Sequence, residues 1–474
     1  MPTGTESRCE PFTSAAIVSA IVAVPLVRVH RALADVMVLP DYGDQWRWST
    51  SISADGRLTP AEVLGEAEPL GHSSYLSIIG AHVSMDSGYD TMWMIGSIGF
   101  VAFAATLAWL VCSVTESLDS TNPRALAALA ILTGVLAVRL DVPGPLVTTL
   151  LHFEMLYYAV AALGAVVAVV VMSATDEDQG LVELARTHLI SLIGLTLLLV
   201  VGDAPASVLT LSLLGVALLT QVARHPTRRL ALLNAVSAAI ALLVRMAISP
   251  SESRSTWSLV DLVNPATYRE TLELLGAAIA NLGSWTTDES TRQVLHIMIG
   301  SVVVGLLCGA LVVVLRPSTL ARVPHRLQAA LLIVSGFVMV SAFSIAANRV
   351  LNDSHHLSRF VRSTTLTVVA TVLALLVLVA ARRRSATFDQ RQLLVVIGIV
   401  ALIALVRIPG ITDVDDTFPF VRRIRNDAIA LYCSGSKDPD EWARFWGPLA
   451  SGDRIDIILD HNLFGAARTT CGSS

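Results

Sequence analysis

Two aspartates, Asp41 and Asp44, flank a Tyr-Gly turn directly after the first apolar segment, and Trp46 and Trp48 follow them. A carboxylate held just outside a bilayer can act as a general base and accept a proton from a hydroxyl nucleophile. The same residues are also typical of a solvated loop, in which acids keep the chain soluble and tryptophans anchor it at the membrane interface. The composition of the segment leaves both interpretations open.

A second polar group, His355, His356 and Arg359, precedes the tenth apolar segment in the stretch NDSHHLSRF. His355 and Arg359 are four residues apart and would share one face of a helix. The planar guanidinium of arginine fits a phosphate group, so Arg359 with His355 predicts a phosphate-binding position. Contact with lipid headgroups is the alternative for an arginine at an interface. Adjacent histidines on a helix point apart, so the pair predicts no metal site.

Glu154 stands at the start of the fourth apolar segment, two residues after His152. A carboxylate at membrane depth is a candidate functional group, although a hydrogen bond to a neighbouring helix would explain it equally well. Cys433 and Cys471 lie in the C-terminal tail, where an oxidising compartment would permit a disulfide between them. The sequence has no CxxC pair, no zinc-ligand spacing and no Walker-type phosphate loop.

Long apolar segments separate these residues and must position them. Of the 474 residues, 54% are hydrophobic and 15% are charged, and the mean hydropathy is +0.65, whereas a soluble domain carries roughly 25% charged residues. The segments are about 17–23 residues long, enough to cross a hydrocarbon core of about 30 Å. We therefore expect an all-α integral membrane protein with about eleven transmembrane helices, which excludes a soluble enzyme. The predicted spans are 14–38, 92–114, 123–139, 154–173, 187–202, 206–222, 230–248, 295–315, 328–346, 363–381 and 392–408.

Arginines are concentrated in three short loops between these spans. If the N-terminus is cytoplasmic, all three loops lie on the inner side, as the positive-inside rule requires, and an odd number of spans places the C-terminal tail outside. The long polar segments 39–91, 249–294 and 409–474 then lie on the outer face, where we expect the chemistry. The loop arginines are Arg224, Arg228, Arg229, Arg316, Arg322, Arg326, Arg382, Arg383, Arg384 and Arg391.

The chain divides into a transmembrane domain, residues 1–408, and a small outer C-terminal subdomain, residues 409–474. Residues 265–285 are amphipathic and predict a re-entrant or surface helix, and residues 440–449 predict a short amphipathic helix. Lys437 is the one lysine beside many arginines, which is typical of a high-GC bacterial genome and indicates a bacterial inner membrane. No basic tract has the length or aromatic spacing of a nucleic-acid groove.

An acidic residue in a long outer segment immediately after the first span resembles the GT-C superfamily of membrane glycosyltransferases. More narrowly, the chain resembles a group of bacterial GT-C-like proteins with Asp-Gln-Trp after the first span and Glu-His-Arg about two dozen residues later. The first element is intact at residues 44–46. The second departs from the pattern, because Pro-Leu-Gly separates Glu68 from His72 and Ser73 stands where the arginine is expected. Because the element is incomplete, Glu68 and His72 are named only as additional candidate site residues.

The resemblance extends to Glu154 at the start of span four and to Ser-Arg-Phe at residues 358–360. It implies a GT-C-like fold that transfers a sugar from a polyprenyl-phosphate donor to a glycan or lipid acceptor of the cell envelope on the outer face. It implies Asp44 as the general base on the acceptor hydroxyl, with Asp41 as a substitute. Arg359 and His355 would hold the donor phosphate. Dependence on a divalent metal is left open.

A transporter or flippase of a lipid-linked or amphipathic substrate is the alternative from another class. It predicts inverted repeats and broken spans at matched positions in two halves, and the sequence shows no such symmetry. It also leaves the long outer segments unexplained. Because the Glu-His-Arg element is degraded, a non-catalytic subunit in cell-envelope assembly is a third interpretation.

Overall fold

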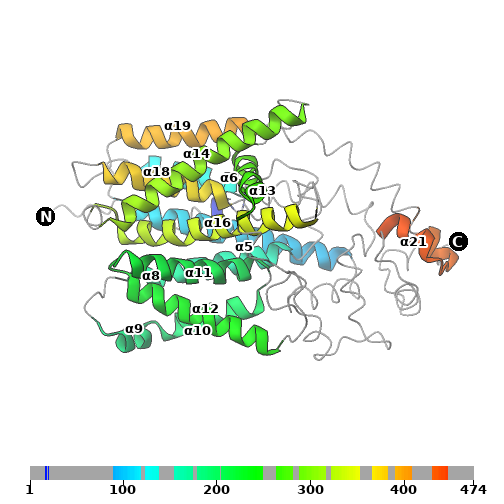
Figure 1. Cartoon of the computed structure of the whole chain (residues 1–474), viewed down its shortest axis with the longest axis horizontal. Coiled ribbons are helices and arrows are strands. Elements are labelled where there is room, and N and C mark those ends of the chain that lie inside the picture. Colours follow the sequence, from blue (N-terminus) through cyan, green and yellow to red (C-terminus); the bar gives the residue numbers. More distant parts are fainter. Residues whose placement is uncertain are drawn as a thin grey trace.

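The computed structural model is a bundle of helices (Figure 1), and no strand occurs among the residues that it describes. The all-helical prediction is confirmed for this part of the chain. The described residues are 16–18, 20, 89–118, 123–137, 154–174, 179–202, 204–248, 263–280, 288–316, 322–352, 366–382, 390–407, 427 and 430–446. Their helices are α5 (Tyr89–Glu116), α6 (Pro123–Ala137), α8 (Glu154–Met172), α9 (Leu181–Thr187), α10 (Leu189–Val201), α11 (Ala204–Val222), α12 (Arg228–Ile248), α13 (Pro265–Ile279), α14 (Glu289–Leu315), α16 (His325–Asn352), α18 (Leu366–Ala381), α19 (Gln390–Arg407) and α21 (Pro439–Trp446).

Five described helices, α5, α11, α12, α14 and α16, are long and apolar enough to cross a bilayer. Helices α9 and α10 meet at 75° and give a sixth candidate span if they are taken together. Four shorter apolar helices, α6, α8, α18 and α19, coincide with predicted spans. The prediction of a multi-pass membrane protein is therefore supported by five to six spans. The count of eleven stays a prediction, since most of the first span, 14–38, lies outside the described residues.

Three helices differ from the sequence prediction, and one of them is α14, which begins at Glu289, six residues before the predicted start at 295. Helix α9 was not predicted, because its seven residues, LVELART, are too few and too polar to register as a span. Helix α16 continues to Asn352, six residues beyond the predicted end at 346. Its apolar window ends at Ala347, and the polar residues that follow still satisfy their backbone hydrogen bonds within the helix.

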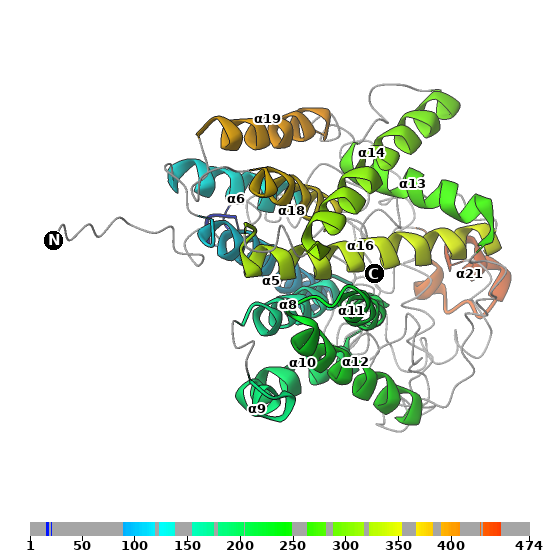
Figure 2. The ribbon, with the colours of Figure 1, turned by 60° about the vertical axis from the view of Figure 1, so that its left-hand side comes forward.

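Helices α16 and α18 form the centre of the bundle. Helix α16 contacts α8, α11, α13 and α18, and nearly every residue of α18 is buried. Helix α14 is peripheral, because only 28% of its apolar window is buried, against 67% for α16. It leans across the other helices in both views (Figures 1 and 2), and α13 is its main neighbour.

Local capping explains where several helices begin. Asp288 accepts hydrogen bonds from Ser290 and Thr291 at the start of α14, which also lowers the pKa of Asp288, chiefly through the Thr291 hydroxyl. Asn264 accepts from the Ala266 amide at 3.0 Å and precedes Pro265 at the first position of α13. These are the side-chain acceptors and the proline position that helix starts favour.

Candidate functional site

Two hydrogen bonds define the two ends of the bundle. Arg326, at the start of α16, donates to Ser113 O near the end of α5 at 3.4 Å. Arg322 donates to Ala381 O, the last residue of α18, at the same distance. We call the end that contains these residues the basic end. Because α5 and α18 run antiparallel to α16, the starts of α5 and α18 and the end of α16 lie at the opposite end.

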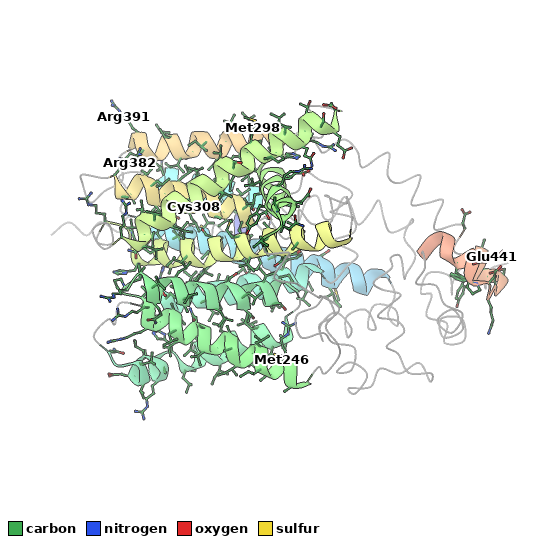
Figure 3. The ribbon with its side chains drawn as sticks, in the orientation of Figure 1. Met246, Met298, Cys308, Arg382, Arg391 and Glu441 are labelled. Atoms are coloured by element: carbon green, nitrogen blue, oxygen red, sulfur yellow. The ribbon has the colours of Figure 1, made fainter. Side chains whose placement is uncertain are left out.

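Arginines gather at the basic end among the described residues. Figure 3 shows Arg382 and Arg391 there, at the junction of α18 and α19. Arg229 also donates to Gln179 O at 2.9 Å and joins α12 to the connection before α9. The described arginines near helix termini at this end are Arg124, Arg186, Arg224, Arg228, Arg229, Arg316, Arg322, Arg326, Arg382 and Arg391.

Most of the predicted site residues lie outside the described residues. The segment before Tyr89 leads into α5, and residues 353–365 join α16 to α18, so both segments meet the bundle at the opposite end. The predicted residues in these segments, and in the tail, that are not described are Asp41, Asp44, Glu68, His72, His355, Arg359 and Cys471.

Glu154 is the first residue of α8. The Asn234 side-chain amide, near the start of α12, donates to Ala168 O near the end of α8 at 3.0 Å. Since α12 begins at the basic end, α8 ends there, and Glu154 lies at the opposite end. The helix start predicted at this position is confirmed, and the roles of Glu154 stay a prediction.

A buried polar cluster that the sequence analysis did not single out lies between α13 and α14. Glu273 is 3% exposed, and its Oε2 accepts a hydrogen bond from Gln293 Nε2 at 2.9 Å. His296, 5% exposed, lies one turn further along α14, and its Nε2 is 3.1 Å from Ala280 O. The imidazole N–H thereby satisfies a carbonyl at the buried C-terminus of α13, where a donor is needed.

Two glycines permit the close approach of these helices. A Cβ on Gly276 would lie 1.8 Å from His296 O, and a Cβ on Gly300 would lie 1.9 Å from Leu272 O. Both distances are far shorter than a Cβ can keep from a backbone atom, so only glycine fits at these two positions. The backbones of the two helices are therefore in direct contact at this crossing. The signal in the sequence was the helical spacing of Glu273 with Gly276 inside an otherwise apolar run.

Arg245 is a second buried charged residue at the opposite end. It is 4% exposed in the last turn of α12, and its Nη1 donates to Leu199 O in the last turn of α10 at 3.4 Å. A cation beside the carbonyls that end a helix is favoured by the helix dipole. Arg245 thus has a structural role at the end of α10.

His225 is a buried titratable residue of the basic end, in the turn between α11 and α12. Its Nδ1 accepts from the Thr227 backbone N–H at 3.3 Å and is 2.9 Å from the Thr227 hydroxyl. Burial is the main cause that lowers the pKa of His225, and the charge of His325 adds to it, whereas Gln328 and a carbonyl of Val314 oppose the shift. The hydrogen bonds to Thr227 thus hold the ring within the α11–α12 turn.

The turn itself has the hydrogen bonds of a Schellman motif. The His225 amide donates to Thr220 O at 2.9 Å and the Arg224 amide to Gln221 O at 3.1 Å. Arg224 has a φ of +53°, the left-handed conformation that this motif requires and that glycine usually supplies. These hydrogen bonds end α11 and set the direction of the turn into α12.

The amphipathic helix predicted at residues 440–449 is confirmed as α21, Pro439–Trp446. Trp442 is fully buried on it, and its Nε1 donates to Ser436 O at 2.7 Å. Cys433 is disulfide-bonded. Its pairing with Cys471 stays a prediction, because Cys471 lies outside the described residues.

No group of three or more potential metal ligands occurs within the part of the chain that the structure describes. The polar groups that remain as a candidate site are therefore the α13–α14 cluster and the segments that join the opposite end. Comparisons with protein families, with curated proteins and with solved structures found no match to this chain.

Proposed function

We propose that the protein is a membrane glycosyltransferase of the GT-C type that transfers a sugar from a polyprenyl-phosphate donor to a glycan or lipid acceptor of the bacterial cell envelope. The observation that supports it most is convergence at one end of the bundle. The segment with Asp41 and Asp44 and the segment with Arg359 and His355 both join helices there. The arginines at the basic end support an orientation in which that end faces the cytoplasm and the opposite end faces the outside of the cell.

In the proposed reaction an acceptor hydroxyl attacks the anomeric carbon of the donor sugar. The hydroxyl proton passes to Asp44, with Asp41 as the substitute base. The bond between the anomeric carbon and the phosphate oxygen breaks, and polyprenyl phosphate leaves. Arg359, assisted by His355, stabilises the negative charge that develops on that phosphate. A single displacement of this kind inverts the configuration at the sugar carbon.

Replacement of the candidate base tests the proposal. In a strain that lacks the gene, we expect one envelope glycan or glycolipid to lose a sugar, measured by composition analysis of purified envelope fractions. The wild-type gene restores the sugar, and the double variant Asp41→Asn/Asp44→Asn does not, although it reaches the membrane in equal amount. Arg359→Lys is expected to retain part of the transfer and Arg359→Ala very little, since lysine keeps the charge but not the planar fork.

Two outcomes would contradict the proposal. If the deletion leaves every envelope glycan unchanged, the protein is not a transferase of this kind. If the double aspartate variant restores the glycan fully, the base assignment is wrong. Movement of a lipid-linked sugar across the membrane that is lost with the gene, while transfer itself persists, would favour the flippase alternative.

A further inference from the structure

Two of the connections between helices at the basic end carry most of its positive charge. Residues 316–328 run from the end of α14 into the first turn of α16, and residues 382–391 run from the end of α18 into the start of α19. Together these two segments contain seven arginines and one acid, Asp389. Such an excess of one sign attracts an anionic partner.

The other connections at this end have nearly balanced charges. Residues 173–188 and 223–230, which lead into α10 and α12, contain four arginines and four acids. Residues 116–124, between α5 and α6, contain two acids and one arginine. The positive-inside rule applies equally to every connection on one side of the membrane, so it does not explain why the excess is confined to two neighbouring connections.

The packing of α14, α16, α18 and α19 brings these arginines to one corner of the bundle. Arg316 caps the end of α14, which packs against α18, and Arg382 follows the last residue of α18. Arg322 Nη1 donates to Ala381 O at 3.4 Å, so its guanidinium lies beside the residue that precedes Arg382. Figure 3 places Arg382 and Arg391 at the same edge of the bundle. We call the exposed residues Arg316, Arg322, Arg382 and Arg391 the arginine corner.

Exposed apolar side chains stand one helical turn from these arginines. Val312 on α14 precedes Arg316 by four residues. Leu394 and Val395 on α19 follow Arg391 by three and four residues. Positions three or four apart share a helix face, so the corner presents charge at its tip and apolar surface behind it. A phospholipid has the matching arrangement, a charged headgroup followed by acyl chains.

We propose that the arginine corner binds an acidic phospholipid of the leaflet that surrounds the basic end. A guanidinium pairs with a phosphate through two parallel N–H···O hydrogen bonds, and basic pockets between transmembrane helices on this side of a membrane are suited to acidic headgroups. The acyl chains lie along the exposed faces of α14 and α19. The site is independent of the proposed glycosyl transfer, which is placed at the opposite end.

A purely structural role for the same arginines makes a different prediction. Arg322 donates to the last carbonyl of α18, and a cation at that position offsets the negative end of the helix dipole without any lipid. In that case the protein would bind acidic and neutral phospholipids equally well. Lipid selectivity therefore separates the two roles.

The test measures lipid binding to the full-length protein, freed of lipid in a neutral detergent, by native mass spectrometry. The probes are phosphatidylglycerol and phosphatidylcholine with the same acyl chains. We expect phosphatidylglycerol to bind at least about tenfold more tightly. Inorganic phosphate in excess is not expected to displace it, because phosphate has no acyl chains to contact α14 and α19.

The double variant Arg322→Gln/Arg382→Gln removes two charges from the arginine corner. Its affinity for phosphatidylglycerol should fall about fivefold for each arginine, about 25-fold in all, with no change for phosphatidylcholine. The matched control is Arg186→Gln/Arg224→Gln, which removes two exposed arginines from the connections with balanced charge. The control should bind phosphatidylglycerol as tightly as the wild type.

A second double variant decides the case in which the loss of Arg322 prevents folding. Arg382→Gln/Arg391→Gln leaves the bond between Arg322 and Ala381 in place, and it should weaken phosphatidylglycerol binding by the same factor. Three results would each overturn the proposal: equal binding of the two phospholipids to the wild type, displacement of phosphatidylglycerol by inorganic phosphate, and an equal loss of affinity in the control and in the corner variants.

Discussion

Polar side chains donate to helix carbonyls at both ends of the bundle, and the opposite end also holds a buried carboxylate. At the basic end, Gln328 Nε2 donates to Val323 O at 2.6 Å, and Arg326 donates to Ser113 O. At the opposite end, the buried carboxylate of Glu273 accepts from the neutral amide of Gln293. A carbonyl that receives a donor from another helix adds cohesion between the two helices, and the buried carboxylate has the same effect through the amide that donates to it from α14. The two ends therefore differ in one buried group, a carboxylate at the opposite end, and the location of any chemistry stays a prediction.

Thiol labelling in spheroplasts tests which end of the bundle faces the cytoplasm. Arg186 and Lys437 are both exposed, the first beside the basic end and the second just before α21. With a membrane-impermeant maleimide we expect Lys437→Cys to react in intact spheroplasts and Arg186→Cys to react only after lysis, an all-or-none difference. Labelling of Arg186→Cys without lysis would reverse the orientation and remove the outer location of the candidate site.

Substitution at the α13–α14 crossing should have the largest effect on stability. Gly276→Leu places a side chain where His296 O lies 1.8 Å from the Cβ position, so the backbones must separate. We expect a loss of more than about 3 kcal/mol, because overpacking against backbone exceeds the usual cost of a larger core side chain. The measurement is the melting temperature and the recovery of monodisperse protein.

Gly305→Ala is the control for this substitution. Gly305 lies on the same helix, α14, and a Cβ there meets nothing within 4 Å. Alanine favours a helix over glycine by about 1 kcal/mol, so the variant should be neutral or slightly stabilised. A Gly276→Leu protein as stable as Gly305→Ala would show that the close crossing of α13 and α14 is absent.

The basic end should show a modest pH dependence that comes from His225. Burial lowers the pKa of His225 in the folded state from its ordinary value of 6.5. Below pH 6.5 the unfolded chain therefore holds a proton that the folded protein lacks, and stability falls with decreasing pH. The loss is at most about 1.4 kcal/mol per pH unit, and it ends below the folded pKa.

The variant His225→Gln should lack this part of the pH dependence. The melting temperatures of wild type and variant, compared between pH 7.5 and pH 5.5, give the difference. Above pH 7.5 the two curves should run parallel. Curves that stay parallel down to pH 5.5 would mean that the imidazole is not held neutral by burial, and the contrast between the two ends would weaken.

Hydropathy predicted most helices of the bundle from sequence. The predicted spans 206–222 and 295–315 coincide with α11 and with most of α14, because a continuous apolar segment of this length is stable as a helix in the absence of water. It could not predict α9, which is short and amphipathic, or the extension of α16 to Asn352. Hydropathy reports where a helix leaves the apolar environment and not where its hydrogen bonds end.

The residues of the candidate site were predicted from residue type and position in the chain, and fewer of them could be predicted than of the helices. Asp44 and Arg359 were chosen for residue type and position in outer segments, and their roles stay predictions. Glu273 was noted only as part of an amphipathic segment. Its significance depends on burial by α14, α16 and α18, which are distant in sequence, so a pattern within one helix does not contain it.

The amino-acid sequence by itself determined that the chain is helical, crosses a membrane several times and concentrates arginine in a few short loops, since each of these properties is local and follows from the cost of burying polar groups in lipid. Only the tertiary structure decided that α13 is inserted into the bundle and that Gly276 and Gly300 let its backbone meet that of α14. It also decided that Glu273 is enclosed there with Gln293 as its partner. Contacts between helices depend on which faces pack together, and the residues that form them are chosen by the whole fold.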